Sequence, residues 1–433
     1  LGRVLRSPYP GAIIAFNIEM IYLDDVLEAT GGQLVGARTP TEFPAFCYNS
    51  QRLIPGELFV AVKTEGGDGH DYLQEAMEGG AGGILCQFPP SDPQVPCIVV
   101  PDTQIALTEW ADFVLRKHNP DVVAVTGSTG KTDVCRAIAA VLTSQYRVFS
   151  NPPGLSNTFG LPLALEKLNP EHEVAVLEMA SHAFGDISAM AALTRPGVGI
   201  VTSVNHAHLA YLESLEAIAD EKGGLVEAIP SDGVAVLNYD DPRVRAMQER
   251  TTASIITYGK SPDADVVASD LRPEPEGLRL VVHLPGVSGL GIPGYPAKAE
   301  VQTQLLGRHQ GMPVAAAIAV GLSYQVPWSD ILDALEDLRP GPGRLQMLPG
   351  IEGASLLDGS AGSNPTSAVQ ALSTLSDYPA ERRLAILGDM AQLGSYAVEG
   401  HRQVGRAAAG IADLLVTQGE RAVWIAEGAE EAG

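Results

Sequence analysis

VVAVTGSTGKTDVC, residues 122–135, places a run of β-branched residues directly before a glycine-containing loop and a helix-like segment. A strand that runs into a loop and a helix aims backbone N–H groups and the positive end of the helix dipole at one point, where phosphate oxygens bind. Gly127 and Gly130 let the backbone approach a ligand, Lys131 can reach the outer phosphates, and the Thr132 hydroxyl suits Mg²⁺. The pattern predicts a nucleotide-binding loop made of Gly127, Ser128, Thr129, Gly130, Lys131 and Thr132.

This loop is shorter than the most familiar phosphate-binding motif, G-x-x-x-x-G-K-[ST]. The longer motif would need glycine at the position of Val125, and Gly127 is the first glycine available. An ordinary strand-to-helix turn that happens to contain Gly-Lys-Thr is the alternative. The strand before the loop and the helix after it favour nucleotide binding.

Composition limits the kinds of partner. The chain has 433 residues, of which 45% are hydrophobic and 18% charged, so we expect two or three folded domains. The formal net charge of −24 opposes a general attraction to nucleic acid or to anionic lipid. An anionic ligand therefore needs a local pocket of cations or backbone N–H groups.

The chain shows no feature of a membrane or secreted protein. Its early apolar run, AIIAF, is far shorter than the roughly 20 residues of a membrane helix, and no cleavable signal is evident. The four cysteines lack C-x-x-C spacing, so neither a disulfide framework nor a zinc site is expected. We predict a cytoplasmic protein with reduced thiols. Because the sequence opens without Met and stops shortly after a strand-like segment, one or both ends are expected to be missing.

Hydrophobic periodicity predicts an α/β protein of three domains. A small α/β domain spans residues 1–118 and ends after a helix-like stretch. Residues 119–339 alternate strands and helices, which predicts a mostly parallel sheet, with an antiparallel patch over 251–305. The Pro- and Gly-rich run LRPGPGRLQ is a linker, and a third α/β pattern follows over 340–433.

Three further polar residues lie where elements of the central domain end or pack. Glu178 closes the strand VAVLEM, His208 follows GIVTSVNHA, and Lys222 lies in a predicted helix over 214–229. Ligands of open parallel sheets bind at the carboxyl ends of the strands, so Thr132, Glu178 and His208 are candidate ligands of one metal ion. Taken singly, a Glu or His at a strand end is more often a loop residue, and a solvated helix lysine is the alternative for Lys222.

The order of motifs resembles the Mur ligases of peptidoglycan synthesis, and within them the MurF branch that adds D-alanyl-D-alanine. The motifs are GSTGKT, SNTFGLPLAL, EMASHAFGDI, NHAHLAYLESLEAIADEKGGLVEAIPSDGVAVLNYDDP, GRHQ and GDMAQLG followed by EGHRQVG. In addition, PGELFVAVKTEGGDGHDYLQEAMEGGAGGILCQ is similar to the N-terminal uridine-nucleotide-binding domain of MurE and MurF. The resemblance spans nearly the whole chain, and the short phosphate loop is this family's form.

The resemblance implies a monomeric, ATP-dependent amide ligase whose small-molecule substrates are a UDP-MurNAc-peptide and D-Ala-D-Ala. It implies an N-terminal UDP-substrate domain, a central ATP domain and a Rossmann-like domain for the incoming amine. It also implies two Mg²⁺ sites and a carbamylated Lys222. The matched positions are Lys131, Lys222, His208 and Arg344 for catalysis; Thr132, Glu178, His208 and Lys222 for metal; Gln310, Arg344 and Asp358 for ATP; and Ser50 and Asn157 for substrate.

Several positions depart from the family pattern. DGSAGSNP replaces DDSYNANP, Gln310 replaces the Asn of GRHN, and Asp133 stands where Thr is usual. The N-terminal DSR is Asn49-Ser50-Gln51. Three alternatives stay open beside a MurF-type ligase: a MurE-like ligase for a different amine, a non-catalytic ATP-binding relative, and a plain P-loop kinase, which leaves the N-terminal domain without a role.

Overall fold

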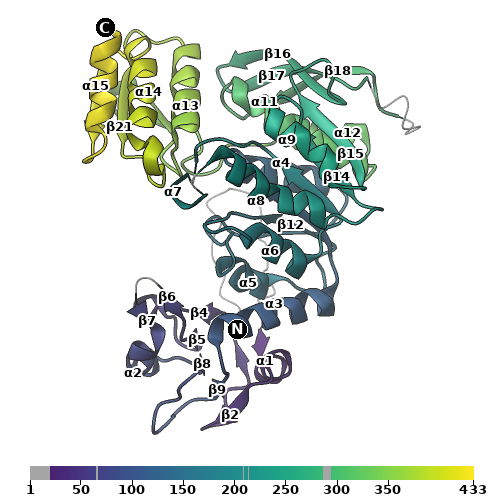
Figure 1. Cartoon of the computed structure of the whole chain (residues 1–433), viewed down its shortest axis with the longest axis vertical. Coiled ribbons are helices and arrows are strands. Elements are labelled where there is room, and N and C mark those ends of the chain that lie inside the picture. Colours follow the sequence, from purple (N-terminus) through teal and green to yellow (C-terminus); the bar gives the residue numbers. More distant parts are fainter. Residues whose placement is uncertain (1–19, 65–66, 208, 213, 286–293) are drawn as a thin grey trace. The chain divides into compact units, whose positions relative to one another are not determined.

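The computed structural model describes residues 20–64, 67–207, 209–212, 214–285 and 294–433 (Figure 1). The chain forms two compact units. The first comprises the residues up to Asn119 together with Pro162–Pro170, and the second comprises Pro120–Leu161 and Glu171–Gly433. The predicted division into three domains, at residues 118/119 and 339/340, stays a prediction.

The first unit is built on a five-stranded sheet in the order β2-β9-β8-β5-β4, in which only β2 runs antiparallel to its neighbour. Its strands are β2 (Gln33–Val35), β4 (Phe46–Cys47), β5 (Leu58–Val60), β8 (Gly83–Cys86) and β9 (Cys97–Val99). Its helices are α1 (Leu23–Thr30), α2 (Leu73–Glu78) and α3 (Thr103–His118), and the short pairs β1 (Ile21–Tyr22) with β3 (Glu42–Phe43) and β6 (Lys63–Thr64) with β7 (Gly67–Asp68) complete it. The Glu166 carboxylate accepts the Phe46 N–H at 2.5 Å, which ties residues 162–170 to this unit.

A nine-stranded sheet in the order β11-β12-β10-β13-β14-β15-β16-β17-β18 organises the second unit. The first seven strands are parallel, and β17 and β18 are antiparallel. The strands are β10 (Asp121–Thr126), β11 (Val148–Ser150), β12 (Val174–Glu178), β13 (Val198–Val201), β14 (Val234–Asn238), β15 (Ser254–Gly259), β16 (Val266–Glu274), β17 (Gly277–His283) and β18 (Lys298–Thr303). The expected antiparallel patch therefore begins at β16, as a continuation of the same sheet.

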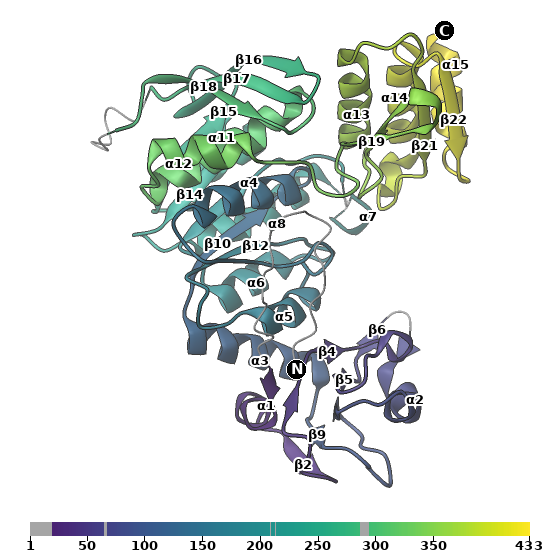
Figure 2. The ribbon, with the colours of Figure 1, turned by 180° about the vertical axis from the view of Figure 1, so that it is seen from behind.

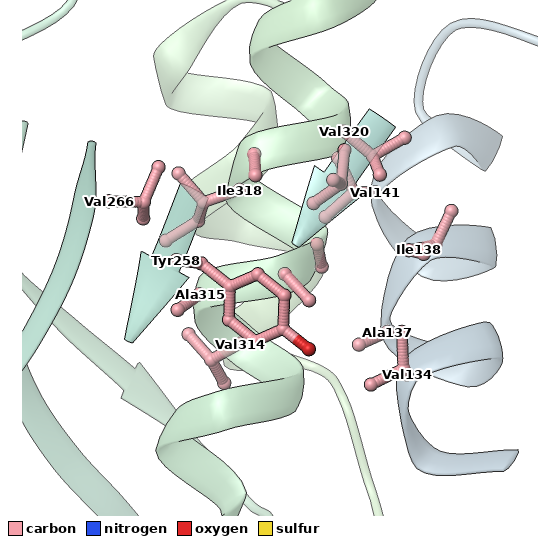
Figure 3. Close-up of a cluster of buried hydrophobic side chains, with 14 of the residues drawn as sticks. Val134, Ala137, Ile138, Val141, Tyr258, Val266, Val314, Ala315, Ile318 and Val320 are labelled. Atoms are coloured by element: carbon pink, nitrogen blue, oxygen red, sulfur yellow. The ribbon is translucent and has the colours of Figure 1, made fainter. Parts of the chain in front are cut away.

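Helices cover the parallel strands, as their nearly continuous burial requires. The helices of this unit are α4 (Lys131–Thr143), α6 (Asp186–Thr194), α7 (Leu209–Leu212), α8 (Leu215–Ala228), α9 (Pro242–Ala246), α11 (Gly311–Ser323) and α12 (Trp328–Glu336), and the short α5 (Gly160–Ala164) includes residues of both units. Figure 3 shows the Tyr258 ring between Val314 of α11 and Val134 of α4. Small residues in α11, GMPVAAAIAVGLS, let it pack closely, and a Cβ at Gly321 would lie 3.0 Å from Val141.

The C-terminal part of this unit has a hairpin of β19 (Gln346–Pro349) and β20 (Ser355–Asp358) and a parallel pair of β21 (Leu384–Gly388) and β22 (Leu414–Gln418). Its helices are α13 (Pro365–Asp377), α14 (Ala397–Ala409) and α15 (Val423–Ala432), which Figure 2 shows from behind. Asn364 caps α13, and Pro365 occupies its first turn. Leu372, Val404 and Ile425 join the three helices in one core.

All four cysteines, Cys47, Cys86, Cys97 and Cys135, are free and buried. Among the described residues, no helix has both the length and the apolar character that a membrane span needs.

Candidate functional site

A cavity of about 640 Å³ opens in the second unit at the carboxyl ends of the parallel strands. This is the edge where open parallel sheets bind ligands. Its wall includes the phosphate loop, the ends of β12 and β13, the segment before α11, the linker around Arg344 and the first turns of α13. All of these elements belong to the same compact unit.

Both glycines of the loop are required by the backbone. Gly127 has φ +143°, and a Cβ there would lie 1.9 Å from the Thr202 Oγ1 and 3.0 Å from the Ser203 nitrogen. Gly130 has φ +86° and caps α4, but open space surrounds it. Gly127 therefore allows close approach to the next strand, whereas Gly130 supplies only the left-handed turn.

Polar residues after β13 hold the loop in place. The Ser128 N–H donates to the Ser203 carbonyl at 2.8 Å, and the Thr202 hydroxyl donates to the Thr129 carbonyl at 2.7 Å. The Asn205 side-chain amide donates to the Thr129 hydroxyl at 2.9 Å. The first N–H groups of α4 have no partner inside the helix, so the fixed loop presents them to the cavity.

Lys131 is the first residue of α4 and is almost completely buried. Its ammonium donates to the Gly127 carbonyl at 2.9 Å. Burial lowers the pKa of Lys131, although the nearby Glu178 carboxylate opposes the shift. A phosphate beside Lys131 would favour its charged form, so the lysine is placed for an anionic ligand.

Thr132, Glu178 and Arg344 meet beside Lys131. The Thr132 hydroxyl donates to the Glu178 carboxylate at 2.8 Å and accepts from the Arg344 guanidinium at 3.1 Å. Asn151 fixes Glu178 from behind: its Oδ1 accepts the Glu178 N–H at 2.8 Å, and its Nδ2 donates to the Glu178 carbonyl at 3.1 Å. The sequence predicted the pairing of Thr132 with Glu178 but did not single out Asn151.

The oxygen pair suits a hard cation. Mg²⁺ is bound in proteins by one or two carboxylates together with hydroxyl, water and phosphate oxygens. The Thr132 hydroxyl and the Glu178 carboxylate are of that kind and line the same cavity. Within the described part of the chain, no three His, Cys, Asp or Glu side chains cluster in a way that would hold a metal by themselves. The pair therefore fits a cation that shares its coordination with a ligand.

Lys222 lies in α8 and is 1% exposed, so its interpretation as a solvated helix lysine is wrong. Burial, with a further contribution from the positive charge of Lys131, lowers the pKa of Lys222 to about 7, and Glu221 opposes the shift. Glu221 itself accepts the N–H groups of Gly185 and Ile187 at 2.5 and 2.8 Å. A substantial fraction of neutral amine is therefore present at physiological pH.

The remaining predicted residues have different surroundings. His208 lies outside the described residues. Gln310 is buried on the cavity wall, and its Oε1 has no hydrogen-bond partner among the described residues. The Asp358 carboxylate accepts the Ser360 N–H at 3.0 Å, and the described cavity wall includes the neighbouring Gly359 but not Asp358.

The two predicted substrate residues lie in different units. Asn157 accepts the Gly160 N–H at 2.6 Å, and its neighbour Ser156, not Asn157, is among the described residues of the cavity wall. Ser50 begins a short 3₁₀ turn of the first unit, Ser50–Arg52, which is capped by Asn49. Neither placement identifies a substrate by itself.

Asn364, His309 and Lys260 are among the residues of the cavity wall that sequence reasoning did not single out. Asn364 donates to the Thr129 hydroxyl at 3.1 Å, and the pair Asn-Pro before a helical pattern was its available signal. Burial lowers the pKa of His309 to about 4, with Lys260 adding to the shift. His309 is therefore neutral at physiological pH.

Comparisons with known proteins agree with this geometry. Residues 125–321 match the Mur ligase middle domain, and residues 343–433 match the Mur ligase glutamate ligase domain. A UDP-N-acetylmuramoyl-tripeptide–D-alanyl-D-alanine ligase of Escherichia coli strain K12 is 33% identical over 404 residues, which are 92% of this chain and 85% of the relative.

Solved structures are similar over most of the chain. A crystal structure of MurF from Acinetobacter baumannii has a TM-score of 0.84 at 24% identity and covers 95% of this chain and 89% of its own. MurF ligase from Thermotoga maritima in complex with ADP has a TM-score of 0.75 at 25% identity, with 88% and 86% covered. The first of these likenesses concerns the fold alone.

Proposed function

The chain belongs to the Mur ligase family, and on that premise we infer that it is an ATP-dependent ligase joining D-alanyl-D-alanine to a UDP-N-acetylmuramoyl-tripeptide. The observation that carries the chemistry is the meeting of Lys131, Thr132, Glu178 and Arg344 at one end of the phosphate loop. The enzyme uses ATP in the synthesis of a peptidoglycan precursor.

The reaction has two steps. A carboxylate oxygen of the tripeptide attacks the γ-phosphorus of ATP, and the bond between the γ-phosphorus and the β-phosphate oxygen breaks. The products of this step are ADP and the acyl phosphate of the tripeptide. The amine of D-alanyl-D-alanine then attacks the acyl carbon, loses a proton, and expels inorganic phosphate to form the amide. Two anions must meet in the first step, so the site has to neutralise charge at the transferring phosphoryl group.

Residues of this chain meet that need. Lys131 and Arg344 approach the same loop from α4 and from the linker, and both are placed to contact phosphate oxygens. The N–H groups at the start of α4 add donors without any change in conformation. The segments at Arg344 and α13 form part of the wall, which limits the access of water to an acyl phosphate.

We assign Thr132 and Glu178 to one Mg²⁺ ion and His208 with Lys222 to a second, following the matched family positions. When bound, the cation offsets phosphate charge. The first assignment is supported by the 2.8 Å distance between the Thr132 hydroxyl oxygen and the Glu178 carboxylate oxygen, which could both bind the same cation. Support for a carbamate on Lys222 is its burial beside Lys131, because a neutral amine can add CO₂ and become an anion that this environment favours.

The carbamate has a direct measurement. Protein equilibrated with ¹³C-labelled bicarbonate is expected to give one carbamate carbon resonance that disappears in Lys222→Ala. Lys167→Ala is the matched control, since Lys167 is half-exposed and belongs, like the Pro44 carbonyl to which it donates, to the first unit. A spectrum without a Lys222-dependent resonance contradicts the assignment.

We further propose the three domain roles: residues 1–118 with Ser50 for the UDP-linked substrate, 119–339 with Asn157 for ATP and the acceptor, and 340–433 for the dipeptide. Gln310, Arg344 and Asp358 are assigned to the nucleotide. We propose a monomer that works in the cytoplasm. The four free, buried cysteines are consistent with a reducing compartment.

The experiment that tests the function is phosphate release from ATP with mass analysis of the product. Release should require both the UDP-MurNAc-tripeptide and D-alanyl-D-alanine, and the product should gain the dipeptide mass. Lys131→Ala should abolish turnover. Turnover with a different amine would identify a MurE-like ligase, and ATP binding without turnover under any substrate pair would identify a non-catalytic relative.

A further inference from the structure

Arg308 connects two parts of the second unit that are far apart in sequence. It lies in the short turn Arg308–Gln310 before α11. Its guanidinium donates to the Leu271 carbonyl on β16 at 2.7 Å and to both Asp377 carboxylate oxygens, at 3.2 Å from Nε and 3.0 Å from Nη2. Asp377 is the last residue of α13. A planar guanidinium that grips a carboxylate through two nitrogens fixes both distance and orientation.

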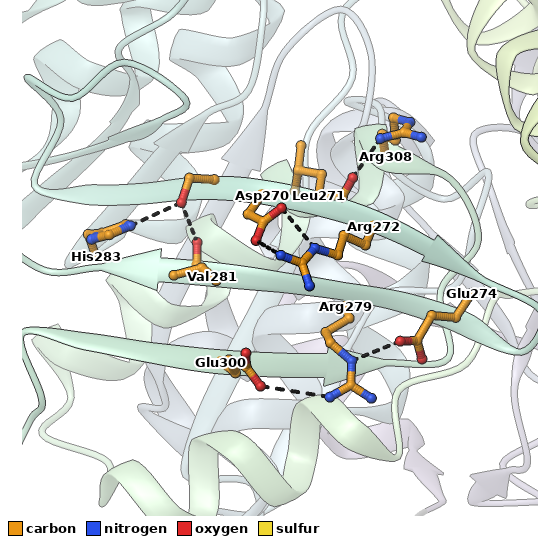
Figure 4. A network of polar contacts seen from close by, with 10 residues as sticks. Asp270, Leu271, Arg272, Glu274, Arg279, Val281, His283, Glu300 and Arg308 are labelled. Atoms are coloured by element: carbon orange, nitrogen blue, oxygen red, sulfur yellow. Dashed lines mark hydrogen bonds and ion pairs between the residues drawn. The ribbon is translucent and has the colours of Figure 1, made fainter.

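The Leu271 carbonyl is available because β16 is irregular at this point. The register with β17 shifts between Ser269 and Arg272, and Asp270 has φ +48°. Such a bulge turns one backbone group away from the ladder. Figure 4 shows the contact between Arg308 and the Leu271 carbonyl beside the separate Asp270–Arg272 and Glu274–Arg279 pairs.

Two neighbouring contacts bring α13 close to the same strands. A Cβ at Gly307, which has φ +93°, would lie 2.2 Å from the Thr374 hydroxyl oxygen. The Tyr378 hydroxyl donates to the Glu274 carbonyl at 3.4 Å. Asp377 is 16% exposed and Arg308 is 52% exposed, so water screens the pair in part and its contribution is modest.

The other end of α13 lies on the nucleotide cavity. Asn364, which caps the helix, donates to the Thr129 hydroxyl of the phosphate loop. Thr366, Ser367 and Gln370 of its first turns line the cavity. His309 and Gln310, directly after Arg308, also line it. The helix is therefore held at both ends, by Asn364 at its start and by Asp377 at its end, and of these two residues only Asn364 belongs to the described cavity wall.

We propose that the Arg308–Asp377 pair is a latch that holds α13 against the nucleotide cavity and slows the release of ADP. The proposal rests on the proposed function, since it takes the cavity to be the ATP site. Arg308 acts as a positioning residue: the described cavity wall contains its two successors but not Arg308 itself. For nucleotide to leave through this wall, α13 has to move, and the two-nitrogen grip on Asp377 opposes that motion.

The test is the dissociation rate of a fluorescent N-methylanthraniloyl ADP, followed by stopped flow after displacement with excess ADP. Arg308→Gln and Asp377→Asn should each speed dissociation about three- to tenfold, where tenfold corresponds to about 1.4 kcal/mol. The double variant should be no faster than either single variant, because both break the same contact. Exchange of the two charges in Arg308→Asp with Asp377→Arg should recover part of the slow release.

The matched control is Arg279→Gln. Arg279 pairs with Glu274 and Glu300 on the same sheet but makes no described contact with α13, so its removal should leave the rate unchanged. Steady-state kinetics separate a latch from a structural role: the latch variants should raise KM for ATP with kcat equal to or above wild type. Unchanged dissociation in Arg308→Gln, or equal acceleration in Arg279→Gln, overturns the latch.

Two further outcomes are decided by the same set of variants. If Arg308→Gln does not fold, Asp377→Asn breaks the pair with an isosteric change and carries the test alone. If wild-type protein binds the fluorescent ADP but does not join the dipeptide to the UDP-MurNAc-tripeptide, the proposed function fails while the dissociation comparison still decides the latch.

Discussion

Gly127→Ala is expected to damage both folding and nucleotide binding, because the new Cβ has no space. It would lie 1.9 Å from the Thr202 Oγ1 and 3.0 Å from the backbone nitrogen of Ser203. The residue also has φ +143°, a conformation that costs a non-glycine residue on the order of 1–3 kcal/mol. Overpacking adds roughly 1–3 kcal/mol. Together they predict a loss of about 2–6 kcal/mol in the free energy of unfolding of the second unit.

The measurements are thermal unfolding and ADP titration. At about 2 °C per kcal/mol for a unit of this size, the melting temperature should fall by roughly 4–12 °C. ADP affinity should fall at least tenfold, because displacement of the loop breaks the Thr202–Thr129 contact. Gly130→Ala is the matched control: it has positive φ but open space, so only the backbone cost of about 1–2 kcal/mol should appear. Equal losses in the two variants would refute the steric reasoning.

Three other perturbations probe the same site. Asn151→Leu removes its three hydrogen bonds, to the Glu178 N–H and carbonyl and to the Leu155 carbonyl, and should lower the free energy of unfolding by about 2–4 kcal/mol in urea titrations; a change below 0.5 kcal/mol contradicts this. Lys131→Met should abolish turnover yet melt no lower than wild type without nucleotide, because burial lowers the pKa of the lysine and its charge costs stability at neutral pH; calorimetry decides. Because burial lowers the pKa of Lys222 to about 7, more of its amine is neutral at pH 8 than at pH 6. At equal dissolved CO₂, depleted enzyme should therefore regain activity faster at pH 8, and equal rates would count against the carbamate.

Local pattern was sufficient to predict the centre of the site. Lys131 and Thr132 follow a buried strand at fixed spacing, and Glu178 ends the strand that pairs with it, so the parallel sheet brings them together whatever the rest of the chain does. The same reasoning does not predict the burial of Lys222. Its burial depends on the close packing of α8 on α6, where a Cβ at Gly224 would lie 2.3 Å from the Ser188 hydroxyl.

Residues in turns were harder to interpret from the sequence. Asn157 and Asp358 both accept backbone N–H groups two or three residues onward, a local use of a polar side chain that competes with ligand binding and leaves no mark in a motif. Arg308 and Asp377 are 69 residues apart and meet only because a bulge in β16 and the end of α13 come together. Hydrophobic periodicity cannot predict such a contact, because it depends on how two distant elements pack against each other and not on the local sequence pattern of either one.

The cavity explains how a chain with a large negative net charge can bind an anionic nucleotide. A protein with net charge −24 repels a nucleotide at long range, so binding has to come from short-range contacts. Lys131, Arg344 and Lys260 supply cations on the wall, and burial of Lys131 makes its charge costly until an anion arrives. Phosphate bound beside Lys131 would offset the cost of burying its charge. Arg344, which contacts Thr132, would face the same phosphate. Asn364, which caps α13, contacts the same loop, and the Arg308–Asp377 pair holds the other end of this helix, so the proposed latch would act on nucleotide release through α13.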